Sequence, residues 1–557
     1  MFQRTWQLGV SLLVLALFTA CGGGSSSNPD VQITIQARFE KRPLTPTGFG
    51  ATVTRPARYC RAEVREASSS TLLASGYLGS DGTGVATVPA GTSAYVQVFA
   101  EYQVPSADPN NSFLEGSVRN EPLPGSFAST NAFLAVPTWS VTSDVIQANQ
   151  DGTLTVTALA SNRIAGAFNI ADQAVSFGAA VRDMDGSTTL RLPSLHTFWT
   201  TSTLAADQSR TYPALAQGPG TTVLVSNQRA LFTHSVYGNG SGTANTESDE
   251  WDDGVLQETF ARLLFADGSY KADGSSALSL LRRDNDNVWV DRTVQSESTA
   301  AFVAGFSDFL SAAVRNDSRI LDSYVDGTGV FRVDAFDLTD HAFVPDADKG
   351  EFSRGSIAVS LWGLWKNVLG GSGTGLNTLW AAVRSTTAYP NGTGEFEQGT
   401  LGCFPTYLQG VASRVSTTTW TAALTELALE QVPNPDALYF SGNALWLTRP
   451  VGFSEAGSLQ TYAAATGLYY DRNQSQAYRF THGGGSRTLT MTPTSGQDFY
   501  LELIGPGGWV AGSTGNDLTG HTRTLTVTNL PAGVYVARVR AGATSSTGMN
   551  TFNISVN

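Results

Sequence analysis

The segment that best indicates the fold of the central part of this 557-residue chain is Asp249-Glu250-Trp251-Asp252-Asp253-Gly254-Val255-Leu256-Gln257-Glu258-Thr259-Phe260-Ala261-Arg262-Leu263-Leu264. Its apolar side chains recur at helical spacing, at Val255, Leu256, Phe260, Leu263 and Leu264. Residues three and four apart lie on one face of an α-helix, so this spacing predicts a helix over 255–265. An acidic run, 249–253, leads into that helix.

The segment resembles the catalytic helix of secreted bacterial zinc metallopeptidases, in which an acidic approach and an apolar pair lead into the motif H-E-x-x-H. That motif works because two imidazoles four residues apart reach one Zn²⁺ while the intervening Glu polarises its water. Here the five positions read Gln257-Glu258-Thr259-Phe260-Ala261, so both histidines are replaced. The resemblance implies a metallopeptidase-like α+β domain that lacks the first two zinc ligands.

A second predicted helix, 298–314, resembles the one that supplies the third zinc ligand in the gluzincin type of these enzymes. The family pattern there is E-x-x-x-D, with the Glu on the metal and the Asp behind a histidine. This chain has Ala304 at the Glu position and retains Asp308. The resemblance therefore implies that all three zinc ligands are absent.

Two further stretches follow the same family order. Residues 354–365 resemble a helix of the type E-G-S-x-A-x-x-L-W-D-L-W, with Arg354 and Gly363 in place of its acids. Residues 165–172 resemble the segment that opens the peptidase domain. The resemblance thus extends over about residues 165–370.

The replaced positions predict that zinc is lost and that the chain needs no cofactor. Zinc lowers the pKa of its bound water from 15.7 to about 7, which Glu258 alone does not do. Gln257 offers only an amide oxygen, and Ala261 and Ala304 offer no donor. We expect Glu258 to be a helix residue that pairs with Arg262 four positions on, and Asp308 to be a polar helix residue or a cap partner.

The flanking regions have the composition of β-rich proteins. Residues 31–163 alternate apolar and polar side chains in short runs divided by Gly, Pro, Asp and Asn, which predicts an all-β sandwich. Residues 77–91 within it resemble the carboxypeptidase-regulatory modules of secreted proteins, which implies a sandwich of carboxypeptidase-regulatory or immunoglobulin-like type. Helical periodicity gathers in 164–450, with further helices expected over 351–369, 376–383 and 417–429.

Alternation resumes in 457–557, which resembles the bacterial pre-peptidase C-terminal domain, a small β-sandwich. The resemblance consists of a Y-x-F strand at Tyr478, a strand that begins at Asp498 and a P-A-G-x-Y hairpin at Pro531. The predicted architecture is therefore multidomain: an all-β sandwich, a degenerate metallopeptidase-like α+β domain, and a C-terminal all-β sandwich.

The N-terminus predicts export and anchoring. Arg4 precedes an apolar run, 8–18, that at about 11 residues is too short to span a bilayer. The small residues before Cys21 and the Gly/Ser-rich stretch after it resemble a bacterial lipoprotein signal, which implies a signal peptide over 1–20, lipidation of Cys21 and a tether over 21–30. We expect a lipid-anchored protein of the cell envelope, at the outer membrane or cell surface.

The net charge limits the possible partners, and the other two cysteines raise the question of a disulfide. The formal charge of −13 would repel phosphate backbones, so we expect no nucleic-acid partner. Cys60 and Cys403 leave two alternatives open, a disulfide or two separate buried thiols. Three functions also stay open: binding or scaffolding with an unknown protein, peptide or glycan ligand, hydrolysis by Glu258 with unrecognised groups, and a purely structural envelope role.

Overall fold

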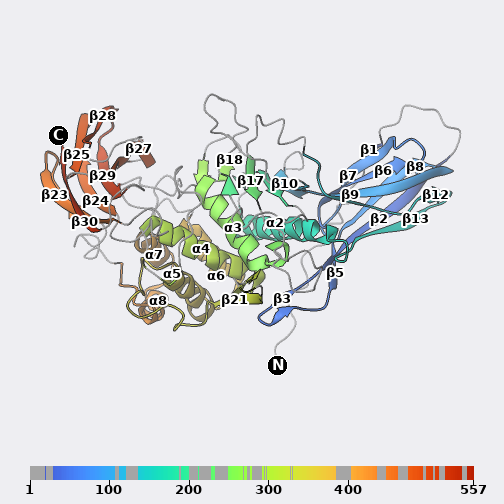
Figure 1. Ribbon diagram of the computed structural model, residues 1–557, viewed down its shortest axis with the longest axis horizontal. Coiled ribbons are helices and arrows are strands. Elements are labelled where there is room, and N and C mark those ends of the chain that lie inside the picture. Colours follow the sequence, from blue (N-terminus) through green and yellow to red (C-terminus); the bar gives the residue numbers. More distant parts are fainter. Residues whose placement is uncertain are drawn as a thin grey trace.

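A computed structural model describes the following residues: 19–20, 29–106, 112–120, 136–186, 190–192, 194–199, 211–212, 228–232, 249–267, 269–271, 276–278, 292–293, 295, 298–325, 328, 330–383, 403–435, 447–461, 475–493, 497, 499–505, 508–512, 521–541 and 548–557. Cys21, the rest of the expected tether up to residue 28 and most of the expected signal peptide lie outside these residues. The chain is strand-rich, with several sheets and an N-terminal β domain. Figure 1 shows that β domain in blue, the helices in green to brown, and the C-terminal sheets in orange and red.

The N-terminal β domain consists of two sheets that share a core. One contains β2 (Asp30–Lys41), β5 (Val53–Pro56), β8 (Thr83–Pro89) and β13 (Gly152–Ala158). The other contains β1 (Thr19–Ala20), β6 (Cys60–Glu66), β7 (Leu72–Tyr77), β9 (Thr92–Pro105), β10 (Ser112–Arg119), β11 (Ser140–Thr142) and β12 (Ile146–Ala148). Alternate residues of β2 and β9 are buried, because successive side chains of a strand point to opposite faces. The alternation in the sequence predicted this β domain correctly.

The second of these sheets continues beyond residue 163. Strand β10 pairs in parallel with β15 (Ser194–Phe198), which pairs in parallel with β17 (Gln228–Phe232), and β16 (Thr211–Tyr212) closes that edge. The N-terminal strands and the central helices also share one hydrophobic core. The expected boundary at 163–164 therefore coincides with the start of a helix but is crossed by a sheet.

Helix α2 (Ile164–Asp185) lies against strands β9 and β10 in this shared core. It ends at Gly186, whose φ of 63° is the left-handed conformation that commonly stops a helix. By length and composition α2 is the one helix among the described residues that could cross a membrane, but 72% of its apolar window is buried inside the protein. It is therefore a core helix.

The central helices are 3-10 turn η1 (Asp249–Trp251), α3 (Asp253–Asp267), α4 (Ser298–Arg315), α5 (Arg354–Gly363), α6 (Gly373–Val383), α7 (Phe404–Ala412) and α8 (Thr417–Leu429). The predicted helices over 255–265, 298–314, 376–383 and 417–429 correspond to α3, α4, α6 and α8. The helix expected over 351–369 instead starts at Arg354 after the N-cap Ser353 and changes to a π-helical turn, η2 (Leu364–Val368).

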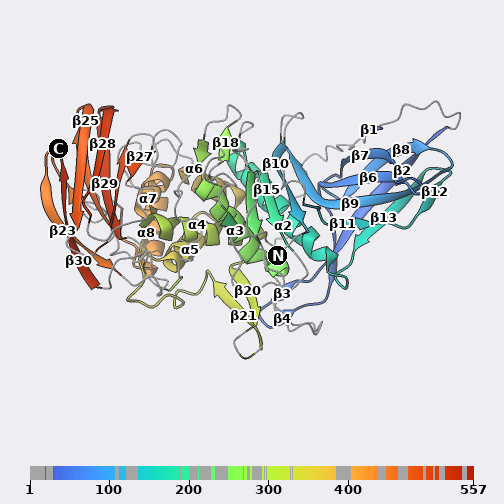
Figure 2. The same ribbon diagram turned by 45° about the horizontal axis from the view of Figure 1, so that its top comes forward.

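Two small sheets accompany these helices. One is formed by β14 (Leu190–Arg191), β18 (Ser269–Lys271) and β19 (Ser276–Leu278). The other is the hairpin β20 (Arg319–Val325) and β21 (Phe331–Asp337), which projects beside the hairpin of β3 (Leu44–Thr45) and β4 (Gly48–Phe49), as Figure 2 shows. The rings of Phe49 and Phe331 lie 5.5 Å apart and join the two hairpins.

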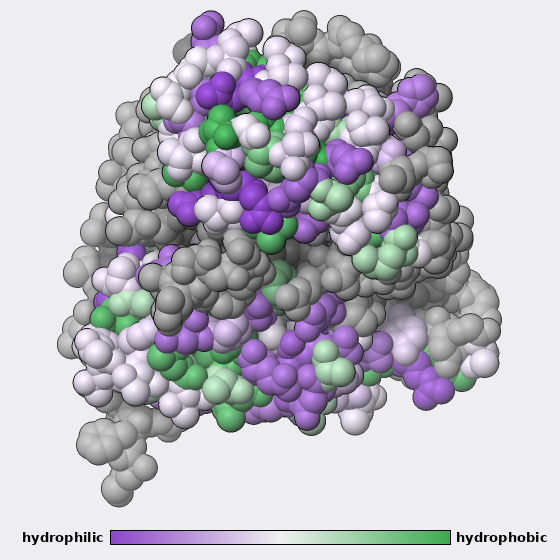
Figure 3. Space-filling model, turned by 90° about the vertical axis from the view of Figure 1, so that its left-hand side faces the viewer, coloured by the Kyte–Doolittle hydropathy of each residue, from purple (hydrophilic) through white to green (hydrophobic). Residues whose placement is uncertain are grey.

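The C-terminal region has a core of its own between two sheets. One sheet has the order β22 (Leu447–Thr448), β24 (Ser475–His482), β29 (Gly533–Ala541), β26 (Phe499–Gly505) and β27 (Gly508–Gly512). The other has the order β23 (Ser454–Thr461), β30 (Gly548–Val556), β25 (Gly485–Pro493) and β28 (Arg523–Leu530). Strand β22 precedes residue 457, where the sequence analysis placed the start of this region, and β23 begins three residues before it. Hydrophilic and hydrophobic residues are interspersed over this end of the molecule in Figure 3.

Candidate functional site

Helices α3 and α4 pack directly against each other, so the positions that the sequence resemblance aligns with zinc ligands are buried. The hydroxyl of Ser311 on α4 donates to the carbonyl oxygen of Gly254 on α3 at 2.7 Å. Gln257, Ala261 and Ala304 are 1%, 0% and 1% exposed. The amide of Gln257 points to α2, where its Nε2 donates to Oε1 of Gln173 at 2.8 Å.

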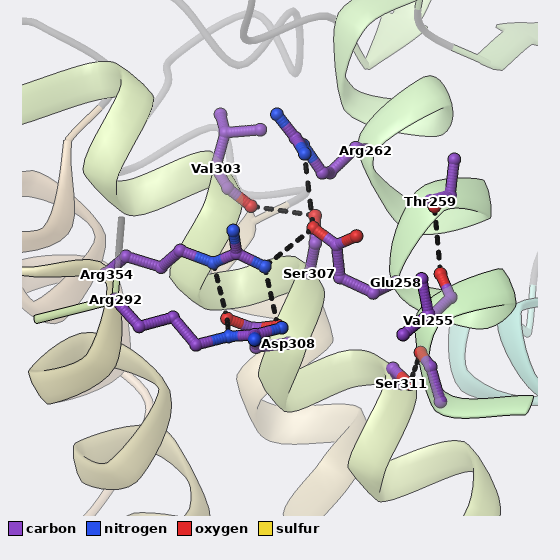
Figure 4. A network of polar contacts seen from close by, with 11 residues as sticks. Val255, Glu258, Thr259, Arg262, Arg292, Val303, Ser307, Asp308, Ser311 and Arg354 are labelled. Carbon is purple, nitrogen blue, oxygen red and sulfur yellow. Dashed lines mark hydrogen bonds and ion pairs between the residues drawn. The ribbon is translucent and has the colours of Figure 1, made fainter. Parts of the chain in front are cut away.

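A buried network of charges surrounds Glu258 and Asp308 (Figure 4). Arg354, the first residue of α5, donates from Nε to Asp308 Oδ2 at 2.6 Å and from Nη2 to Asp308 Oδ1 at 2.9 Å. The same Nη2 donates to Glu258 Oε1 at 3.1 Å. Arg292 reaches Asp308 Oδ1 at 3.0 Å, and Arg262 Nε lies 3.5 Å from Glu258 Oε1. One guanidinium thus joins the two retained acids, and each acid has a second arginine.

The centre of the network is cut off from solvent, whereas Arg262 and Arg292 at its edge are partly exposed. Arg354 is 2% exposed, Glu258 is 4% exposed and Asp308 is 0% exposed. Burial by itself would raise the pKa of Asp308, but the charges and hydrogen bonds of Arg292 and Arg354 outweigh it and lower that pKa to about 2. Asp308 is therefore ionised at neutral pH, and its charge is balanced inside the protein.

These positions do not fit a zinc ion. The alanine side chains at 261 and 304 have no donor atom, and the amide of Gln257 is bound to Gln173. Within the part of the chain that the structure describes, no group of three or more His, Cys, Asp or Glu side chains is placed to hold a metal.

Sequence reasoning located Glu258 correctly and missed what Asp308 does. The expected i,i+4 pair between Glu258 and Arg262 is present. Asp308 is a polar residue of α4, which is one of the two expected alternatives, and it is not a cap partner, because it accepts hydrogen bonds from two arginines in the core. The sequence offered a signal for this, since the resemblance aligns Arg354 with an acid of the family pattern and aligns Glu258 and Asp308, which could neutralise it, with acids of that pattern. Arg292 carried no such signal.

The two cysteines are separate buried thiols. Cys60 lies in β6 and Cys403 precedes α7, where its main-chain N–H donates to the hydroxyl of Thr406 at 3.2 Å. The disulfide alternative is therefore not what the structure shows. Burial raises the pKa of the Cys60 thiol, which makes the reactive thiolate scarce at neutral pH.

A Ser–His pair is also buried in the sheet of β10 and β15. The hydroxyl of Ser117 lies 2.8 Å from Nδ1 of His196, and the two residues are 1% and 7% exposed. Desolvation, followed by the charge of Arg119, lowers the pKa of His196 to about 3, so the ring is neutral. Because both side chains are almost inaccessible, we interpret this contact as a structural hydrogen bond and not as a catalytic pair.

An open pocket lies on the other side of α3, where the β2 end, the β3–β4 hairpin, α2, α3 and α4 meet. Its volume is about 490 Å³, and we call it the α3 pocket. It is lined by Lys41, Pro43, Leu44, Arg55, Pro56, Arg58, Asp172, Gln173, Ser176, Trp251, Asp253, Gly254, Gln257, Val314, Arg315, Asp317 and Leu321. Gln257 therefore faces both Gln173 and this pocket, whereas Ala304 does not line it.

No family model matches this chain, and no curated protein matches it. Among solved structures, the pre-peptidase C-terminal domain of a collagenase from Bacillus anthracis is similar over 20% of this chain and 93% of its own length, at 14% identity and a TM-score of 0.15. Periplasmic inhibitors of g-type lysozyme from Aeromonas hydrophila and Salmonella Typhimurium are similar over 20% of this chain and 96% and 98% of their own lengths, at 17% and 14% identity and TM-scores of 0.14 and 0.13.

Proposed function

We propose that this protein is an exported, lipid-anchored binding or scaffolding protein of the bacterial cell envelope, whose central domain is a catalytically inactive relative of zinc metallopeptidases. The observation that supports this best is the position of Arg354, whose guanidinium joins Glu258 and Asp308. In the enzymes that the sequence resembles, the equivalents of these acids serve a metal-bound water and a histidine. Here they neutralise an arginine.

The charge of the network argues against hydrolysis by Glu258 with other groups. Three guanidiniums and two carboxylates already share the space, so a divalent cation would meet net positive charge. A general base must reach the proton that it removes, directly or through one water. Glu258 is 4% exposed and is paired with two arginines, which opposes that role.

The α3 pocket favours binding over a purely structural role. Ligand sites are concave and commonly occupy about 300–1,000 Å³, and the α3 pocket falls in that range. It also lies where a β domain meets a helical region, which is a frequent position for such sites. A scaffold that served only as packing would have no need of an open, polar cavity there.

The test measures metal content and peptidase activity of the purified full chain. We expect no stoichiometric zinc in elemental analysis and no cleavage of casein. We also expect chelation to leave the melting temperature unchanged, because only the removal of a metal that binds the folded state would lower the melting temperature. One tightly held zinc per chain together with chelator-sensitive cleavage would overturn the proposal. Cleavage that needs no metal and is lost in Glu258→Gln, but not in the exposed control Asp346→Asn, would establish the hydrolase alternative instead.

A further inference from the structure

The α3 pocket contains polar atoms that the described residues leave without hydrogen-bond partners. Nε and Nη2 of Arg315, at the C-terminal end of α4, are buried and make no hydrogen bond within the described part of the chain. Oε1 of Gln257 is also buried and accepts no hydrogen bond within the described part of the chain, and this residue is 1% exposed. A buried polar group without a partner is destabilising, so three such atoms around one cavity point to a ligand that satisfies them.

These atoms lie close together along α3. A Cβ placed on Gly254 would lie 3.1 Å from Nη2 of Arg315, so the guanidinium sits over the first turn of the helix. Gln257 is three residues further on, and residues at that spacing are neighbours on one helix face, about 5–6 Å apart. The pocket therefore offers two donors from a guanidinium and, one helical turn away, one acceptor.

The charges in the pocket favour an anion with a single negative charge. Its lining has four cationic and three acidic side chains in a protein whose formal charge is −13. The acids are already engaged: Asp253 with Lys41, Asp172 with Arg58, and Asp317 with Arg319. Lys41 and Arg58 are engaged by the same pairs, so the lining cations without an ion pair to a lining acid are the exposed Arg55 and Arg315. A carboxylate would meet the charge of Arg315, whose Nε and Nη2 are buried, whereas a doubly charged phosphate would be repelled more strongly by the same acids.

We propose that the α3 pocket binds a carboxylate that has a hydrogen-bond donor next to it, with the carboxylate on Arg315 and the donor on Oε1 of Gln257. This proposal rests on the proposed binding function and names its ligand class. The planar fork of an arginine matches a carboxylate with two parallel hydrogen bonds, and the first turn of α3 adds the positive end of a helix dipole. Pro43, Leu44 and Leu321 supply apolar contact for the rest of the ligand.

Two sources present this chemistry. The last residue of a short peptide has an amide N–H beside its carboxylate, and a sugar acid has hydroxyl groups beside its own. Isothermal titration of the full chain with trialanine, trialanine amide, galacturonic acid and galactose separates them. We expect at least one of the two acids to bind, and its uncharged counterpart to bind about tenfold more weakly or not at all. The acid that binds identifies the source.

Variants locate the binding. We expect Arg315→Gln to weaken binding by at least about tenfold, Arg315→Lys to weaken it less, and the control Arg182→Gln, which lies outside the pocket lining, to leave it unchanged. Gln257→Met should reduce affinity for the acid by removing the acceptor. Circular dichroism checks that each variant is folded. If a variant does not fold, the comparison of each acid with its uncharged counterpart on the unaltered chain still tests whether the pocket binds a carboxylate.

The proposal is overturned if neither acid binds, if an acid and its uncharged counterpart bind equally, or if folded Arg315→Gln binds as the unaltered chain does. None of these results would affect the measurement of zinc content and casein cleavage. Conversely, a chain that holds zinc and cleaves casein would refute the inactive-relative proposal whatever the titrations show. The two failures are therefore distinguishable.

Discussion

Replacement of Arg354 by methionine should destabilise the central helices strongly. The substitution keeps an unbranched side chain but removes three hydrogen bonds, two to Asp308 and one to Glu258. Removal of one partner of a buried ion pair costs about 3–5 kcal/mol, because the other charge stays buried. Arg292 and Arg262 still face the two acids, so we expect a loss of about 3 kcal/mol, at the lower end of that range.

The pH dependence of this loss is a second signature. The pKa of Asp308 is lowered to about 2 in the folded protein from its ordinary value of 3.8, a difference that corresponds to about 2 kcal/mol. Because the folded pKa is the lower one, this stabilisation is present above about pH 4 and is lost as the pH falls towards 2. The difference between the unaltered chain and Arg354→Met should therefore shrink over that interval.

Urea unfolding followed by circular dichroism at 222 nm measures the effect, because every α-helix among the described residues lies between 164 and 429. The double variant Arg354→Met/Asp308→Asn should lose less unfolding free energy than the sum of the losses of the two single variants. The reason is that removing both charges leaves neither of them buried without its partner. Arg182→Met, at a half-buried arginine outside the network, serves as a control. A loss below about 0.5 kcal/mol for Arg354→Met at pH 7, or additive single variants, would refute the role given to this network.

Three further outcomes can be measured. Phe306→Ala should cost about 3–5 kcal/mol in the same assay, because its ring is 1% exposed and packs among other aromatic rings, whereas the 49% exposed Leu429→Ala should cost little. Gly305→Ala should cost about 1–3 kcal/mol, since the added Cβ would lie 2.7 Å from Cβ of Ile357, and an unchanged stability would show that α4 and α5 can separate. Cys21→Ser should move the protein from the membrane fraction to the soluble fraction, and equal retention on membranes would remove the lipid anchor from the proposal.

The sequence by itself determined the features that depend on neighbours along the chain. Alternation with period two marked the N-terminal β domain, and the stripes at 255–265 and 298–314 marked α3 and α4. It also showed that Ala261 and Ala304 offer no metal ligand, because donor chemistry is a property of the residue type.

Helix α2 and helix α7 were not predicted, for reasons that lie in their packing. Helix α2 is buried over most of its surface, so its apolar residues surround it and leave no stripe on one face. Helix α7 is nine residues long and mostly buried, so it too has little polar face to reveal its period. Periodicity identifies a helix best when a broad face lies in water, and α2 and α7 each expose only a narrow, partly buried face.

Only the tertiary structure decided what the retained acids do and where a ligand can enter. Arg354 lies 46 residues from Asp308 and 96 from Glu258, so no local pattern could show that one guanidinium joins them. Likewise, the α3 pocket brings Arg315 beside Gly254 from a different helix, and its walls come from strands near the N-terminus. The physical reason is that buried charges need partners at about 3 Å in space, and the packing of helices and sheets, rather than the order of residues, sets which partners are that close.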